Sequence, residues 1–313
     1  MSRRSVLLMG VLAATWGASY LFIKIGLRDL SAPFLVSSRL ALGTLVLLPF
    51  ALRVHPLRAL RGRWPSVVLL ALANMAGSFL LITYGEERIA SGLTGVLVAS
   101  SPVFAALIGL RFDRSARLGP LGWGGIGLGM VGVLVLFGAD LTADGDLVVG
   151  GLMVLLSGVG YAIGAHLMRA RMAGVPPVAT ATATMGVSAL VTLPFALASL
   201  PDAVSTKPLL SLLVLGAVGT GLAFLLFYTL ISEVGAARAS VVAYVAPGFS
   251  VFYGAVALGE PVTVGAVAGL VLILLGSWLT ARDKAPTVAA TVAPAPTRSG
   301  PSRSSVPAPA RAR

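Results

Sequence analysis

The residues of this sequence best placed to do chemistry are charged side chains within long apolar stretches. Lys24 lies near the end of one stretch, and Arg39 lies about 10 Å into the next at 1.5 Å per residue. Charge inside a bilayer is costly, so such residues usually mark a solute pathway or a buried structural pair. Lys24 has a further alternative, because a lysine can extend its ammonium group to the membrane surface. We expect both residues to contact a solute or to form part of a gate.

Further candidates for ligand binding are aromatic or polar side chains within the apolar stretches. Trp16, Ser19 and Tyr20 recur at helical spacing with Lys24 and therefore form one stripe. An apolar cavity with a few polar anchors is the usual composition of a small-ligand site, and core packing is the alternative for each side chain. The predicted substrate-binding residues are Trp16, Ser19, Tyr20, Lys24, Arg39, Asn74, Tyr161 and Tyr244.

Four charged residues at the ends of apolar stretches are predicted to act as gates. Glu86 and Glu87 end the third stretch, and either could pair with Arg39. Arg169 and Glu233 end the sixth and eighth stretches, on the other side of the membrane. We expect two charge clusters, one at each mouth of a pathway, that form and break alternately. Ordinary interfacial charges are the alternative for all four residues.

No cofactor or metal is expected. Cysteine is absent, the two histidines are far apart in the sequence, and no H-E-x-x-H motif occurs. Proton coupling is conceivable through His166 or through one of the three glutamates just named, and the sequence selects none of them.

The composition places the chain in a membrane. Of its 313 residues 57% are hydrophobic and 11% charged, and the mean hydropathy is +0.95. A spanning helix needs about 20 mainly apolar residues. Ten such stretches occur, at approximately 6–25, 32–53, 66–84, 91–110, 120–138, 148–168, 178–200, 208–231, 238–258 and 261–280. We therefore predict an all-α integral membrane protein with ten transmembrane helices.

The two halves of the chain are related by duplication. The pentapeptide LPFAL occurs at 48–52 and again at 193–197, and other residues match at the same offset of 145, including Trp16 with Tyr161, Lys24 with Arg169, and Pro102 with Pro247. The predicted repeats, 6–138 and 148–280, hold five spans each, so the second enters the membrane inverted. Inverted repeats can open a shared cavity to one side and then the other. Pro102 and Pro247 are predicted hinges, with static kinks as the alternative.

The distribution of basic residues predicts the orientation. The net charge of +12 would suggest nucleic acid for a soluble protein. Here most arginines that flank the spans fall on the cytoplasmic side if the N-terminus is cytoplasmic, while the outer loops hold only Arg28, Arg88 and Lys207. We expect residues 1–5 and a disordered tail at 283–313 to be cytoplasmic, and we expect no nucleic-acid partner.

An ordered set of motifs resembles a known family. Residues 16–24 read WGASYLFIK, Arg39 lies in the second span, Pro102 and Pro247 lie in the fourth and ninth, and Gly259-Glu260-Pro261 precedes the tenth. Over about 6–280 this set is similar to the EamA-like branch of the drug/metabolite transporter superfamily. The resemblance implies a bacterial inner-membrane permease without ATP hydrolysis, which moves small metabolites such as amino acids, often outward. It also implies that spans 5 and 10 are peripheral. One departure is Asp113-Arg114, where a glutamate like Glu260 would be expected.

The predicted function is secondary active transport by alternating access, with export favoured. Because the first span carries Lys24 and no carboxylate, a carboxylate-bearing or zwitterionic substrate is favoured. Broad-specificity drug or metabolite efflux is the alternative within this class, and a channel or an intramembrane enzyme is the alternative outside it. The expected partners are a small-molecule substrate and the lipid bilayer, and the sequence leaves monomer and homodimer open.

Overall fold

The computed structural model describes residues 2–53, 56–112, 118–138 and 145–282. Within these ranges all regular structure is helical, and eight helices are long and apolar enough to cross a membrane. Two shorter apolar segments, Pro120–Leu136 and Val242–Leu258, accompany them. The predictions for the 283–313 tail and for Asp113-Arg114 lie outside the described residues.

The helices follow the predicted stretches closely. They are α1 (Arg3–Gly26), α2 (Ala32–Arg53), η1 (Pro56–Leu60), α3 (Trp64–Leu70), η2 (Ala71–Gly77), α4 (Ser78–Arg88), α5 (Ser91–Val98), α6 (Ser101–Phe112), α7 (Pro120–Gly138), α8 (Gly145–Arg171), α9 (Pro177–Leu197), α10 (Thr206–Gly216), η3 (Ala217–Leu222), α11 (Ala223–Val234), α12 (Ala236–Ala239), α13 (Val242–Leu258) and α14 (Val264–Arg282). The third and eighth predicted stretches are each one continuous helix with an irregular middle, Trp64–Arg88 and Thr206–Val234.

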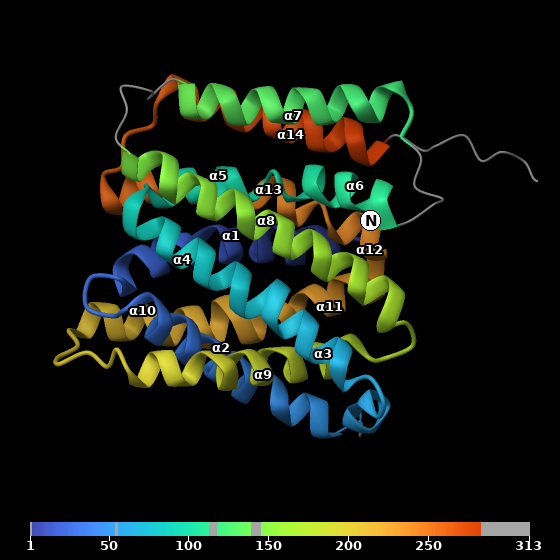
Figure 1. Cartoon of the computed structure of the whole chain (residues 1–313), viewed down its shortest axis with the longest axis vertical. Coiled ribbons are helices and arrows are strands. Elements are labelled where there is room, and N and C mark those ends of the chain that lie inside the picture. Colours follow the sequence, from blue (N-terminus) through green and yellow to red (C-terminus); the bar gives the residue numbers. More distant parts are fainter. Residues whose placement is uncertain (1, 54–55, 113–117, 139–144, 283–313) are drawn as a thin grey trace, which may run out of the picture.

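The pair α7 and α14 forms one edge of the molecule (Figure 1). The two helices run antiparallel, because Gly125 lies against Gly276 and Thr280 while Gly132 lies against Gly269. A Cβ placed on Gly276 would lie 2.5 Å from the Gly125 carbonyl oxygen, so the two backbones touch. Glycine is required here for this close approach.

The opposite edge holds α2 and α9, which carry the two copies of LPFAL (Figure 1). These helices also run antiparallel, since Ser31 Oγ donates to the Ser199 carbonyl (3.0 Å) and Ser37 Oγ donates to the Ala189 carbonyl (3.1 Å). Helices that match in the repeat thus pack against each other in opposite directions at both edges.

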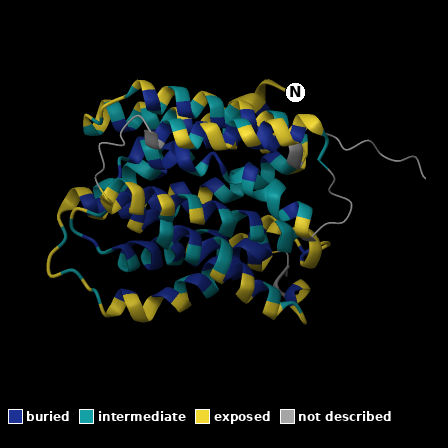
Figure 2. Cartoon of the chain, turned by 45° about the horizontal axis from the view of Figure 1, so that its top comes forward, coloured by how far each residue is buried: buried dark blue, intermediate teal, exposed yellow. Residues whose placement is uncertain are grey.

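The central helices pack across the two halves. Helix α1 packs against α13, α10 and α11, and the matching α8 packs against α6, α4 and η2. Figure 2 shows buried residues gathered between the helices and exposed ones along the outer faces. Many of the exposed side chains are large and apolar, such as Leu134 (67% exposed) and Leu190 (69%), as expected of a surface that contacts lipid.

Two π-helical segments, η2 and η3, lie at matching positions of the repeat. In a π-segment backbone hydrogen bonds run from i to i+5, and carbonyl groups become available to side chains. Ser188 Oγ donates to the Ala71 carbonyl (3.0 Å), and Thr220 Oγ1 donates to the Leu215 carbonyl (2.9 Å). Hydroxyl groups thus donate to a carbonyl at or just before the start of each π-segment. These segments were not predicted from the sequence.

The fourth and ninth predicted spans are interrupted at different places. The break between α5 and α6 falls at Ala99 and Ser100, which puts Pro102 in the first turn of α6, where a missing N–H has no cost. The break between α12 and α13 falls at Ser240 and Val241, and Pro247 lies buried inside α13. The two prolines therefore occupy different backbone settings, and their role as hinges stays a prediction.

Candidate functional site

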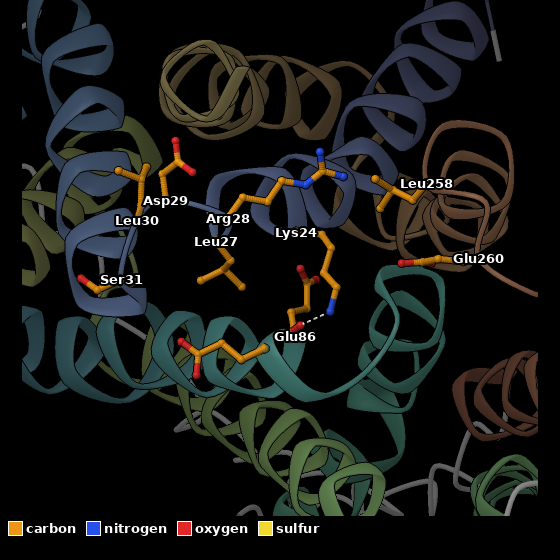
Figure 3. A pocket seen from close by; sticks show the side chains of 10 residues that line it. Lys24, Leu27, Arg28, Asp29, Leu30, Ser31, Glu86, Leu258 and Glu260 are labelled. Carbon is orange, nitrogen blue, oxygen red and sulfur yellow. Dashed lines mark hydrogen bonds between the residues drawn. The ribbon is translucent and has the colours of Figure 1, made fainter. Parts of the chain in front are cut away.

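A cavity of about 780 Å³ opens at the end of α1 remote from the N-terminus (Figure 3). Six charged residues line it: Lys24, Arg28, Asp29, Glu86, Glu87 and Glu260. They come from α1, from the connection after it, from α4 and from the turn before α14. The cavity thus combines three of the residues predicted from sequence with three that were not predicted.

Lys24 is held by the end of α4. Its Nζ donates to the carbonyls of Glu86 (2.5 Å) and Ile89 (2.9 Å). The last carbonyls of a helix lack intrahelical donors and lie at the negative end of the helix dipole, so a cation there is stabilised. The ammonium group therefore caps a helix and forms no ion pair with a carboxylate of the described residues.

Glu260 holds the start of α5 from the opposite half of the sequence. Its carboxylate accepts hydrogen bonds from Ser91 N (2.8 Å), Ser91 Oγ (3.0 Å) and Gly92 N (2.9 Å). Gly259, in the left-handed region at φ 68°, ends α13 and turns the chain so that Glu260 reaches this helix N-terminus. In the sequence Glu260 is marked only by the family turn, and this contact was not predicted.

Glu86 and Glu87 differ sharply although they are adjacent. Glu86 is fully buried (0% exposed), and among the described residues neither of its carboxylate oxygens has a hydrogen-bond partner. Glu87 is exposed at the cavity. Successive residues of a helix point about 100° apart, which explains why only one of them enters the protein.

Arg39 lies buried between the two halves. Its Nε donates to Thr220 Oγ1 in η3 (2.9 Å), and its guanidinium carbon lies 4.1 Å from the centre of the Phe79 ring. Tyr20 and Tyr161 are close enough to interact with it electrostatically. In the described part of the chain the terminal nitrogens of Arg39 have no hydrogen bond, so they are available to a ligand.

Ser19 and Asn74 occupy matching contacts of the two halves. A Cβ on Gly219 would lie 3.1 Å from Ser19 Oγ, and a Cβ on Gly164 would lie 2.5 Å from Asn74 Cγ. Ser19 matches Gly164 in the repeat, and Asn74 matches Gly219, so each polar side chain faces a glycine of the other half. Ser19 Oγ donates to the Thr15 carbonyl of its own helix (3.2 Å).

Of the eight predicted substrate-binding residues, Lys24 alone lines the cavity. Trp16 and Tyr244 pack against other helices. The Trp16 ring packs against Phe224 and Phe227, with centroid distances of 6.0 and 5.1 Å, in an apolar cluster of α1, α11 and α13. The Tyr244 hydroxyl donates to the Ser277 carbonyl of α14 (3.4 Å).

The predicted gate pairs are not formed in this structure. Arg39 contacts Thr220 and Phe79 instead of Glu86 or Glu87. Glu233 pairs with Arg4 (3.4 Å) and accepts a hydrogen bond from Ser5 (3.0 Å). Arg169 Nη2 lies 3.3 Å from His166 Nε2.

Asp29 links the connection after α1 to the start of α10. Its Oδ2 accepts a hydrogen bond from the Ser205 backbone N–H (2.7 Å), and the hydrogen bonds from Ser205 hold the pKa of the Asp29 carboxyl below its usual value. At the same end of the molecule Arg88 forms an ion pair with Asp146 of α8.

Relatives of this chain are named as transporters. It is 25% identical to the uncharacterized transporter YoaV of Bacillus subtilis over 87% of this chain and 95% of the relative. It is 27% identical to the uncharacterized inner membrane transporter YedA of Escherichia coli K12, over 84% and 88%. A probable amino-acid metabolite efflux pump of Salmonella typhimurium is 27% identical over 89% and 95%.

The fold and the family are also matched. A protein known from its crystal structure has a similar fold, with a TM-score of 0.63 over 89% of this chain and 96% of its own, at 20% identity. The model of the EamA-like transporter family matches twice, over residues 3–138 and 148–282, close to the two repeats predicted from the sequence. The predicted resemblance is thereby confirmed, and this multi-pass membrane protein belongs to the EamA-like transporter family.

Proposed function

We propose that the chain is a secondary active transporter that moves carboxylate-bearing or zwitterionic small metabolites, such as amino acids, by alternating access. Ten spans would be arranged as two inverted repeats of five. The antiparallel packing of α7 with α14 and of α2 with α9, and the two family matches, support this arrangement. The cross-packing of α1 and α8 supports a pathway between the repeats.

The substrate class is supported chiefly by Arg39. A buried guanidinium group with unbonded terminal nitrogens is suited to bind a carboxylate through two parallel hydrogen bonds. Its Nε is fixed by Thr220 of the second repeat, so the group is oriented before a ligand arrives. Tyr20 and Tyr161 beside it provide aromatic faces and hydroxyl groups for the rest of a small metabolite.

The proposed orientation puts the N-terminus in the cytoplasm and the 780 Å³ cavity on the outer side. At the cytoplasmic end Glu233 joins α11 to Arg4 and Ser5 of α1. We infer that the structure corresponds to an outward-facing state, with Glu233 in the closed inner gate. Export is the favoured direction, in line with the relative named as an efflux pump.

Reconstituted vesicles test this function. Vesicles loaded with an unlabelled amino-acid mixture should accumulate labelled amino acids transiently by counterflow, and uptake should saturate. Arg39→Gln should lower the rate about 10- to 100-fold, because a hydrogen bond to a charged group contributes about 1.5–3 kcal/mol. Thr184→Val changes the matching residue of the second repeat, whose hydroxyl bonds only within α9, and should leave the rate within about twofold.

Other outcomes would favour the alternatives. Flux that does not saturate and shows no counterflow would indicate a channel, and chemical change of the labelled compound would indicate an enzyme. Counterflow that Arg39→Gln leaves intact would remove the argument for carboxylate recognition.

A further inference from the structure

Among the described residues, Glu86 carries the buried side-chain oxygens that have no hydrogen-bond partner. It is fully buried at the inner wall of the cavity, and neither oxygen accepts a hydrogen bond. Burial of a charged carboxylate is strongly unfavourable unless hydrogen-bond donors or a cation compensate for the lost hydration. The neutral acid avoids that cost, so this conformation favours a bound proton on Glu86.

Neither of the two nearby cations, Lys24 and Arg39, forms a hydrogen bond with the Glu86 carboxylate. Lys24 of α1 donates to two carbonyls, and Arg39 of α2 donates to Thr220, although both lie within electrostatic reach of Glu86. The Glu260 carboxylate, from the turn before α14, adds a negative charge on the side of α5.

Arg28, from the connection after α1, lines the same cavity but is exposed, whereas Glu86 is buried. Helix α8 contributes Tyr161, which lies beside Arg39, and Asp146, which is paired with Arg88. Glu87 lies next to Glu86 in the sequence but is exposed. Lys24 is therefore the cation best placed to neutralise an ionised Glu86.

Lys24 needs little movement to reach the carboxylate. Its Nζ already contacts the backbone carbonyl of the same residue, Glu86, at 2.5 Å. Figure 3 shows the Lys24 amine and the Glu86 carboxyl group side by side at the cavity. A rotation of either side chain would exchange the carbonyl partner for the carboxylate partner.

We propose that Glu86 is the proton-binding residue of this transporter and that Lys24 switches it by moving between the α4 carbonyls and the Glu86 carboxylate. The proton binds a Glu86 carboxylate oxygen from water in the cavity. When the Lys24 ammonium group moves onto the carboxylate, the same proton returns to water, and Lys24 keeps its own protons. This proposal rests on the proposed transport function and selects one residue among the four that the sequence left open.

The proton site can be tested without a known substrate. Infrared difference spectra of the purified full chain between acidic and neutral pH should contain the carbonyl stretch of a buried carboxylic acid. Glu86→Gln should remove that band, and the adjacent Glu87→Gln should keep it. In Lys24→Gln the band should persist to higher pH, with proton affinity about tenfold greater or more, because the opposing cation is gone. Thermal unfolding in detergent would confirm that each variant is folded.

The spectra alone can overturn the site. The site would be overturned if the wild-type difference spectrum contained no band that Glu86→Gln removes, because Glu86 would then not change its protonation between the two pH values. A band unmoved by Lys24→Gln in a folded protein would exclude Lys24 as the switch. Either result would leave the transport function standing, because amino-acid counterflow is measured separately.

Coupling is tested in the amino-acid vesicles with an imposed pH gradient. In Glu86→Gln the counterflow rate should stay within about threefold of wild type. The accumulation driven by the pH gradient should fall at least tenfold. Asp202→Asn, which removes an exposed carboxyl group that does not line the cavity, should keep both. Coupling would be overturned if the pH gradient still drove accumulation in Glu86→Gln. It would also be overturned if the wild type showed counterflow but the gradient drove no accumulation. Both results would leave the carrier function standing. A vesicle that moves no amino acid at all would instead count against the proposed function.

Discussion

The ends of α4 and α11 occupy matching positions in the two repeats, yet they carry opposite chemistry. Glu86 matches Ile231, and the cavity residue Lys24 matches Arg169, which is exposed beside His166. Arg88 pairs with Asp146 at the start of α8, whereas its counterpart Glu233 pairs with Arg4 at the start of α1. The same inter-helix contact is thus made twice with the charges reversed.

The helix packing is shared by the two halves, whereas the charged residues at the cavity are not. Glycine contacts and π-segments recur at matching positions of both halves, and the matched helices α7 and α14 pack antiparallel with their backbones in contact. The buried carboxyl group and the lysine beside it occur in one half only. A duplicated scaffold can therefore keep its packing while one copy acquires a proton or substrate site.

The largest expected effect comes from breaking the symmetric frame at Gly276. A leucine side chain there would collide with the α7 backbone, so Gly276→Leu should lower the free energy of unfolding in detergent by about 3 kcal/mol. Gly127→Leu is the matched control, because a Cβ at Gly127 meets nothing within 4 Å. Equal stability of the two variants would mean that α7 and α14 are not packed as described.

A smaller effect on stability is expected from removing the Glu260 carboxylate, which caps the start of α5 at the cavity. Glu260→Ala removes three hydrogen bonds from the start of α5 and should cost about 1–2 kcal/mol in thermal or chemical unfolding. Thr263→Ala removes the single cap at the start of α14, at 3.1 Å, and should cost less. The reverse order would show that Glu260 does not hold the α4–α5 connection.

The two charge-reversed ion pairs should contribute less still. Arg88→Ala and Glu233→Ala each remove a partly exposed pair and should change the free energy of unfolding by less than about 1 kcal/mol. Their effects should shrink as salt is raised, which unfolding at two ionic strengths would reveal. A cost well above this from one variant alone would show that the two contacts are not equivalent.

The smallest effect is expected at Asp29, and it should depend on pH. The folded protein lowers the pKa of this carboxyl, so its contribution is present above the pKa of the unfolded chain and is lost as pH falls through the folded value. Asp29→Asn should therefore lower the unfolding temperature slightly at neutral pH, and by less near about pH 3, which lies below the unfolded pKa. A variant that is destabilised equally at both values would contradict the role of the Ser205 hydrogen bonds.

Much of the fold could be predicted because its determinants are local. Lipid offers no hydrogen-bond partner for backbone groups, so each membrane-spanning helix corresponds to one continuous apolar stretch of the sequence. The stretches 32–53 and 120–138 were predicted with the bounds that the structure has. The duplication was visible in LPFAL and in the residues at the same offset, and the two family matches agree with it. Membership of the transporter family followed from motifs in a fixed order.

Only the tertiary structure decided which charges do what. The sequence could name Lys24, Arg39, Glu86 and Glu233, but it paired them by charge, whereas Lys24 binds carbonyls and Arg39 binds a hydroxyl. The sequence could not distinguish Glu86 from Glu87. These adjacent side chains point about 100° apart around the helix axis, and only Glu86 enters the protein. The hydropathy of a segment is a sum over its residues, so it can be obtained from the sequence alone. A hydrogen bond depends on where two distant segments meet, and that is fixed only when the helices pack.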